Sequence, residues 1–170
     1  MLILALAAAL SLALMPPISN SNLSLQSSDL HFSAEDDGVK NTVPIPDGIW
    51  SLLKEDVDVQ DVMRNQNPPI KEPQRSWFSA TVVHLHKSTD NDLVVQGEGQ
   101  MMGANVTEFW VFAETEHGPK LVLKVSAHDL LLLNRISSGY SVIEASAVIA
   151  QHVSTLTYTF DGSRYVLAQK

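Results

Sequence analysis

Hydrophobic and polar residues follow three different patterns along the 170-residue chain. Residues 1–15 are almost entirely apolar, residues 49–63 repeat apolar side chains at helical spacing, and apolar and polar residues alternate from residue 76 onward. Alternation with a period of two is typical of a half-buried strand, whereas a spacing of three to four is typical of a helix that buries one side. The sequence therefore predicts a terminal apolar segment, one helix and then a succession of strands.

The first segment, Met1–Met15, is interrupted only by Ser11 and is followed by two prolines and by the small residues Ser19 and Ser21. A membrane-spanning helix needs about 20 apolar residues, so a run of this length is typical of a secretory signal peptide. We expect residues 1–21 to be that signal. An uncleaved membrane anchor is the alternative, and the lack of Lys or Arg before the run leaves open whether the true start lies upstream.

After the signal, residues 22–47 are rich in Ser and Asp and are expected to form a flexible lead-in to a single domain at 48–170. A helix is predicted from about 48 to 63, with Asp47 as its N-cap. Its apolar side would carry Ile49, Trp50, Leu52, Leu53, Val57 and Met63.

The alternating part of the chain contains seven or eight apolar stretches separated by short turns, which we interpret as strands. Connections this short exclude parallel crossovers, so the strands must pair antiparallel. The expected fold class is α+β, with an N-terminal helix packed on a meandering antiparallel sheet of about seven strands. The predicted strands are 77–86, 92–96, 107–114, 120–125, 130–136, 140–150, 152–160 and 164–167.

The composition of the chain limits the classes of partner and cofactor that it can bind. The formal net charge is −8, and the cations are scattered along the sequence, so we expect neither nucleic acid nor, after signal removal, a membrane as partner. The chain has no cysteine, which excludes disulfides and cysteine-based zinc sites or nucleophiles. It also has no phosphate-binding or dinucleotide fingerprint, and no cofactor is expected.

Two groups of side chains are candidates for a site. His84 and His86 are two residues apart on a predicted strand, so both would point to one face and chelate a transition metal with a third ligand such as His128 or His152. A surface role for both histidines is the simpler interpretation. The aromatic residues Phe109, Trp110 and Phe112 lie on one predicted strand and indicate either a central buried strand or an exposed ridge that binds a protein or a glycan.

One stretch resembles a known repeat. Trp77–Met102 reads as a strand, a turn rich in Asp and Asn, and then the strand Asp92-Leu93-Val94-Val95, and this is similar to the hairpins of FG-GAP and VCBS-like repeats. The elements of Gly103–Tyr165 resemble uncharacterised small secreted bacterial proteins that combine such hairpins. The FG-GAP resemblance implies a calcium-binding turn at Asp90 and Asp92, although Lys87 places a cation inside that turn.

These observations favour an exported protein, secreted or periplasmic, that is not an enzyme and acts as a protein-binding or inhibitor-like module. Its partner would be an envelope or extracellular protein, engaged by a loop such as 97–106 or 115–119. The alternative is a hydrolase whose catalytic residues are dispersed in the sequence, with a metal at His84 and His86 assisting. The sequence leaves the oligomeric state open.

Overall fold

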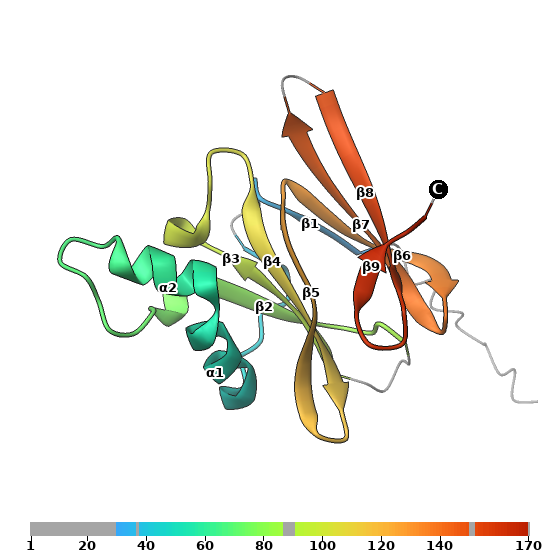
Figure 1. The fold of residues 1–170 in the computed structure, drawn as a ribbon, viewed down its shortest axis with the longest axis horizontal. Helices are drawn as coiled ribbons and strands as arrows, with labels where there is room; N and C mark the ends of the chain where they lie inside the picture. The colour runs from blue at the N-terminus through green and yellow to red at the C-terminus, as the bar shows by residue number, and fades with distance from the viewer. Residues whose placement is uncertain (1–29, 37, 87–90, 150–151, 170) are drawn as a thin grey trace, which may run out of the picture.

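A computed structural model describes residues 30–36, 38–86, 91–149 and 152–169 (Figure 1). Nine strands and two short α-helices make up most of this structure, with 50% of the residues in strands and 17% in helices. The elements are β1 (Leu30–Ser33), α1 (Asp47–Glu55), α2 (Val57–Arg64), β2 (Phe78–Val83), β3 (Asp92–Gly97), β4 (Thr107–Thr115), β5 (Gly118–Ala127), β6 (Asp129–Ser137), β7 (Tyr140–Ile149), β8 (His152–Phe160) and β9 (Tyr165–Leu167), with single 3₁₀ turns at Arg75–Trp77 and Gly99–Met101.

The expected α+β fold class is wrong. The strands form two separate sheets instead of one meandering sheet, and the described part of the chain has two short helices within residues 47–64 instead of one N-terminal helix. The single helix expected at 48–63 is divided at Asp56, whose extended backbone (φ −64°, ψ 135°) ends α1 and begins α2. The Asp56 carboxylate accepts hydrogen bonds from the backbone N–H groups of Asp58 and Val59, so it acts as the N-cap of α2.

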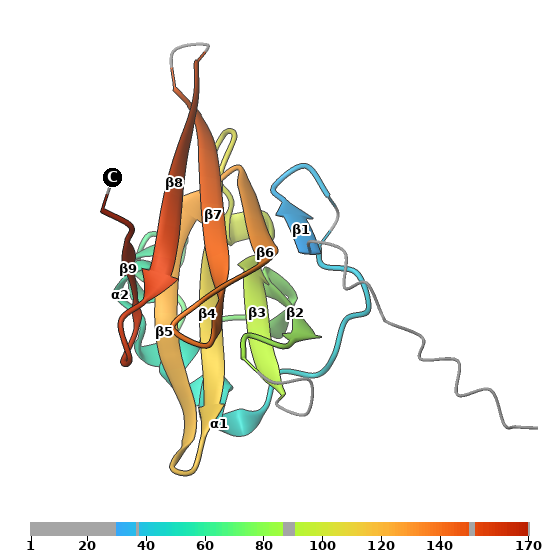
Figure 2. The same cartoon turned by 90° about the vertical axis from the view of Figure 1, so that its right-hand side faces the viewer.

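The two sheets are antiparallel throughout. The four-stranded sheet has the order β2-β3-β4-β5, and the five-stranded sheet has the order β1-β6-β7-β8-β9 (Figure 2). The chain moves from one sheet to the other between β5 and β6. Alternation along each strand determines which side chains share a face, but it does not determine where a series of hairpins changes sheet, and this is why the sequence predicted one sheet.

Each face of the four-stranded sheet is covered, so β4 is buried on both sides. Phe109 and Val111 of β4 face the five-stranded sheet in a core that also contains Val94, Leu130 and Ile143. Residues on the opposite face of β4 pack with residues of α1 and α2 in a second cluster. This second cluster contains Trp110, Phe112, Ile49, Leu53, Val59 and Met63. The molecule is therefore layered as helices, four-stranded sheet and five-stranded sheet.

Part of the expected lead-in is a strand. β1 pairs with β6, and its Phe32 side chain is buried in the core between the sheets. Gln96, which is itself fully buried, donates from Nε2 to the Ser33 carbonyl over 3.1 Å and ties β1 to the facing sheet. The expected signal at 1–21 lies outside the described residues. Within the described ranges, no helix has the length and apolar character needed to span a membrane.

Candidate functional site: a groove between two sheet edges

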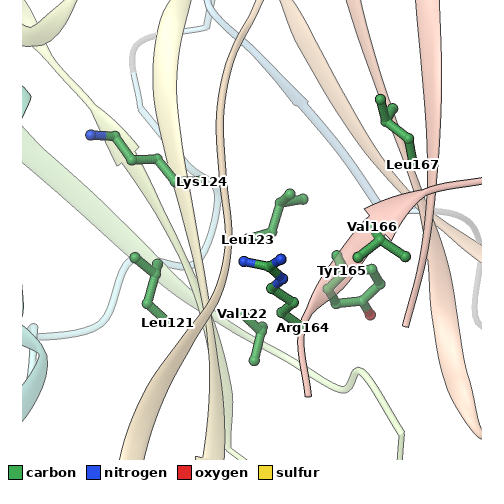
Figure 3. A pocket seen from close by; sticks show the side chains of 8 residues that line it. All are labelled: Leu121, Val122, Leu123, Lys124, Arg164, Tyr165, Val166 and Leu167. Carbon is green, nitrogen blue, oxygen red and sulfur yellow. The ribbon is translucent and has the colours of Figure 1, made fainter. Parts of the chain in front are cut away.

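A groove lies between β5 and β9, the strands that end their respective sheets on the same side of the molecule (Figures 2 and 3). Its volume is about 460 Å³. β5 contributes four consecutive residues, the other wall consists of the three residues of β9 and the Arg164 that precedes them, and most of these residues are apolar. The lining residues are Leu121, Val122, Leu123, Lys124, Arg164, Tyr165, Val166 and Leu167.

The β5 wall of the groove contains a β-bulge. Leu123 pairs with Val111 and Leu121 pairs with Phe112, so Val122 is an extra residue opposite the β4 strand. A bulge of this kind aims two neighbouring side chains to the same side of a sheet. Val122 and Leu123 are accordingly both buried in the core between the sheets, and they form an apolar floor for the groove.

The β9 wall is held in place by Tyr165. Its ring packs edge-on against Phe160 with the centroids 5.5 Å apart, and its hydroxyl donates to the Ser141 carbonyl over 2.8 Å. Burial, with the charge of Asp92 adding to it, raises the pKa of the Tyr165 hydroxyl far above its usual value, so this group stays protonated. Tyr165 is therefore a fixed wall of the groove, and its polar atom is already used.

Cationic groups lie at the mouth of the groove. Arg164 is exposed and extends its guanidinium into the space between β5 and β9 (Figure 3). Lys120 of β5 donates to the Ser163 hydroxyl over 3.0 Å, which joins the two walls at one end. Asp161 shapes this turn by accepting from the backbone N–H groups of Ser163 and Arg164, and these hydrogen bonds lower the pKa of its carboxyl group. The groove thus presents a cation on a protein of net charge −8.

The third cation, Lys124, binds carboxylates of the helical region and stabilises the fold. Its side chain extends away from Arg164 and Tyr165 toward the helices (Figure 3), where its ammonium lies 2.7 Å and 2.8 Å from the two carboxylate oxygens of Asp56 and also contacts Asp58. Burial alone would lower the pKa of Lys124, but the hydrogen bonds that Lys124 donates to Asp56 and Asp58 outweigh it and the pKa is raised. The Lys124 ammonium is therefore occupied by two carboxylates of the helices.

Chemically, the groove can hold an apolar segment and one negative charge. Its floor is aliphatic, its walls come from two different sheets, and its exposed cation is Arg164. Arginine binds carboxylates through two parallel hydrogen bonds. The lining contains no Ser, Thr, His, Asp or Glu that would supply a nucleophile or a general base, so binding is the chemistry that this site supports.

The aromatic candidates lie elsewhere. Phe109, Trp110 and Phe112 are 0%, 1% and 1% exposed, with Phe109 in the core between the sheets and the other two facing the helices. The Trp110 indole N–H donates to the Asp56 carboxylate over 3.1 Å. These side chains form no exposed ridge, and they have the positions expected for a central strand.

The metal candidates are not brought together. His84 is exposed just beyond β2, whereas the His86 ring stacks on Tyr140 with centroids 4.6 Å apart. Asp92 is fully buried and accepts from the backbone N–H groups of Leu85 and Glu114 over 2.8 and 2.9 Å, which is a structural role. Over the described part of the chain, no three His, Asp or Glu side chains are grouped to hold a metal ion. Asp90 lies outside the described residues.

Sequence reasoning missed a polar cluster where β1 meets the start of β6. Asp129 accepts from His31 over 2.8 Å, lies 3.0 Å from His128 Nδ1 and receives the Ser146 hydroxyl over 3.2 Å. The other ring nitrogen of His128 is 3.3 Å from Glu35. The members come from three distant parts of the sequence, so no local motif identifies them. Asp129 of β6 bonds both His31 of β1 and Ser146 of β7, so the cluster holds β1 on the five-stranded sheet.

Comparisons with protein-family models, with curated proteins and with solved structures found no match. The function must therefore be argued from the geometry of the chain itself.

Proposed function

We propose that this chain is an exported, non-enzymatic binding protein that holds an extended, mainly apolar segment of an envelope or extracellular protein in the groove between β5 and β9. The observation that carries the proposal is the groove itself, an apolar hollow of about 460 Å³. The edge strand of one sheet forms each wall, and Arg164 lies at the mouth. The apolar run at residues 1–15 supports the export of the protein.

The open form of the groove favours a segment of a protein over a small molecule. Small-molecule sites usually enclose most of the ligand surface, whereas this hollow runs along the outside of two strands (Figure 3). A segment lying along the groove would pack apolar side chains on Val122 and Leu123 and would place a carboxylate at Arg164. An acidic residue in the segment is favoured because Arg164 is an exposed cation among the residues that line the groove.

The segment would be held mainly by its side chains. Pro119, Lys120 and the bulge at Val122 all interrupt the regular edge that strand addition needs, and β9 is only 3 residues long. Addition of a partner strand to either wall is therefore disfavoured. Recognition then depends on the apolar floor and on the charge of Arg164.

A peptide titration tests the proposal. The probes are a blocked, labelled nine-residue peptide of alternating valine and threonine with one central aspartate, and the same peptide with asparagine instead. Fluorescence anisotropy should show that the aspartate peptide binds about tenfold more tightly, since a charge-assisted hydrogen bond contributes about 1.5–3 kcal/mol. Arg164→Gln should remove the difference.

Arg135→Gln is the matched control, because Arg135 is also exposed but lies on β6, where it faces Glu144 at 3.7 Å. This variant should keep the preference for the aspartate peptide. Equal binding of the two peptides by the unmodified protein, or an unchanged preference in Arg164→Gln, would show that the groove is not the site.

A further inference from the structure

The hairpin formed by β7 and β8 extends beyond the rest of both sheets (Figures 1 and 2). β6 accompanies β7 only to Ser146, and β9 accompanies β8 only from Tyr158 onward. The strand residues beyond these points, 147–149 and 152–156, are paired only between β7 and β8 and with no other described strand. We call these residues the hairpin extension.

The free edge of β8 in the hairpin extension presents backbone hydrogen-bonding groups to solvent. The Thr157 carbonyl accepts from Ala168 N–H over 2.8 Å, so the backbone of Thr157 points toward the β9 side. In a strand the direction of these groups repeats every second residue. The N–H and C=O groups of Thr155 and Val153 therefore point to the same side, beyond the reach of β9.

In the hairpin extension, the side chains of Val148 and of residues 152–156 are exposed and uncharged. Val153 is 72% exposed, its cross-strand neighbour Val148 is 46% exposed and Leu156 is 45% exposed. Residues 145–160 contain no Asp, Glu, Lys or Arg, although the whole chain has 30 charged residues, 11 basic and 19 acidic. The extension thus combines an unpaired edge, exposed aliphatic groups and no charge.

Soluble proteins normally protect a sheet edge with Lys, Pro, a bulge or a covering segment, and an edge that has none of these pairs with another strand. We propose that the β8 edge of the hairpin extension pairs antiparallel with the same edge of a second copy of this chain, about a twofold axis at Ser154. Val153 of each copy would then exchange two hydrogen bonds with Thr155 of the other, which satisfies all of the outward groups of both residues.

Three features identify a second copy as the occupant. Antiparallel pairing of two identical edges is self-complementary and closes as a dimer. The pairing places Val153 of each copy beside Thr155 of the other on one face of the sheet, and such cross-strand pairs of β-branched residues are favourable. Finally, the neutral extension projects from a body of net charge −8, so two copies can approach there with the least repulsion.

The first test is sedimentation equilibrium of the purified protein over a range of concentrations. The unmodified protein should show a reversible monomer–dimer equilibrium with no larger species. Val153→Lys, which adds the charge that protected edges carry, should raise the dimer dissociation constant about tenfold or more, by roughly 1.4 kcal/mol or more of lost association free energy. Ile136→Lys is the matched control, because Ile136 is a β-branched strand residue that is 56% exposed outside the hairpin extension; it should leave the equilibrium unchanged.

A cross-linking test locates the axis and does not depend on the stability of a lysine variant. The chain has no cysteine, so Ser154→Cys introduces the only thiol. Directly opposed residues of a pair without mutual hydrogen bonds have Cα atoms about 4.5 Å apart, within the range that a disulfide bridges. Mild oxidation should therefore give a covalent dimer of Ser154→Cys, whereas Ser126→Cys, at the exposed edge strand β5, should stay monomeric.

Three results would overturn the proposal. The unmodified protein could stay monomeric up to about 1 mM, the range of weak interactions. Ser126→Cys could cross-link in place of Ser154→Cys, which would assign the contact to β5. The protein could also remain monomeric and sediment with phosphatidylcholine vesicles unless Val153 is changed to Lys, which would assign the exposed aliphatic groups to a membrane.

Discussion

The exposed edge of β5 and the hairpin extension are both unpaired parts of a sheet, but they differ in the features that protect an edge from pairing with another strand. β5 carries Pro119, Lys120 and a bulge at Val122, and its Lys124 is tied to the helices through Asp56. The hairpin extension has no charge, no proline and no bulge in residues 147–149 and 152–156. Edge protection is therefore local, because one molecule can block strand addition at one edge and leave another edge open.

The largest expected effect comes from breaking the attachment of β5 to the helices. Asp56→Ala removes the N-cap of α2 and leaves Lys124 and Trp110 without their shared partner. Removing a mostly buried charged partner should lower the free energy of unfolding by about 3 kcal/mol, measured by urea denaturation. Burial raises the pKa of Asp56, but the hydrogen bonds from Lys124 and Trp110 outweigh it and the pKa is lowered. This stabilisation should therefore be present at neutral pH and be lost as pH falls through the folded-state pKa.

Asp61→Ala is the control for this experiment, because Asp61 is 49% exposed and pairs only with Arg64 three residues along α2. Its effect should stay below about 0.5 kcal/mol. A similar loss in the two variants would mean that the attachment of β5 contributes no more than a surface ion pair.

A smaller effect is expected from removing the protection of β5. Replacing Pro119 with Thr and Lys120 with Val together should leave the edge of β5 as poorly protected against strand pairing as the hairpin extension. A second, different self-pairing edge on each molecule permits open chains, so sedimentation velocity should show species larger than a dimer, which the unmodified protein should not form. Lys40→Val removes the same charge from an exposed loop and should produce no such species. Unchanged sedimentation of the double variant would indicate that Pro119 and Lys120 do not protect β5.

The smallest effect concerns the polar cluster at the base of the hairpin extension. The hydrogen bond from His128 to Asp129 raises the pKa of the histidine against the opposing effect of burial, and Glu35 adds to the increase. A raised folded-state pKa contributes stability that is fully present below the unfolded pKa of about 6.5 and is lost as pH rises through the folded value. The free energy of unfolding should fall by about 0.5 kcal/mol across this window.

In His128→Gln this decrease with rising pH should disappear, whereas His117→Gln, in an exposed turn, should retain it. His31 and Asp129 remain in both variants, and the lowered pKa of Asp129 acts in a separate, acidic window. A decrease of the same size in His128→Gln would assign it to His31 or to another group.

The strands were predictable because each one alternates and ends at a turn. All eight expected strands have counterparts in β2–β9, and Leu130–Ile136, with its four leucines, lies within β6. The division of the expected helix at Asp56 was not predictable from the apolar spacing, because that spacing continues past Asp56, and the partners that hold its carboxylate, Lys124 and Trp110, are distant in the sequence. β1 escaped detection because a strand of 4 residues in a polar segment has too little alternation to stand out.

The strands that line the groove were predictable from the sequence, but their proximity in the fold was not. Lys120 and Arg164 are 44 positions apart in the sequence, and the hydrogen bond from Lys120 to Ser163 exists only because β5 and β9 end two different sheets on the same side. The bulge that buries both Val122 and Leu123 depends on pairing with β4, which no single strand specifies.

The sequence by itself determined the strand positions, the acidic charge and the uncharged stretch at 145–160, because each of these depends only on neighbouring residues. Only the tertiary structure decided that the strands separate into two sheets, that β5 and β9 enclose a groove and that the β7–β8 hairpin extends past its neighbours. These features depend on which strands pair and where each pairing stops. The pairing of the strands buries both faces of β4, and this burial needs side chains from the helices and from both sheets. No single segment of the sequence therefore specifies it.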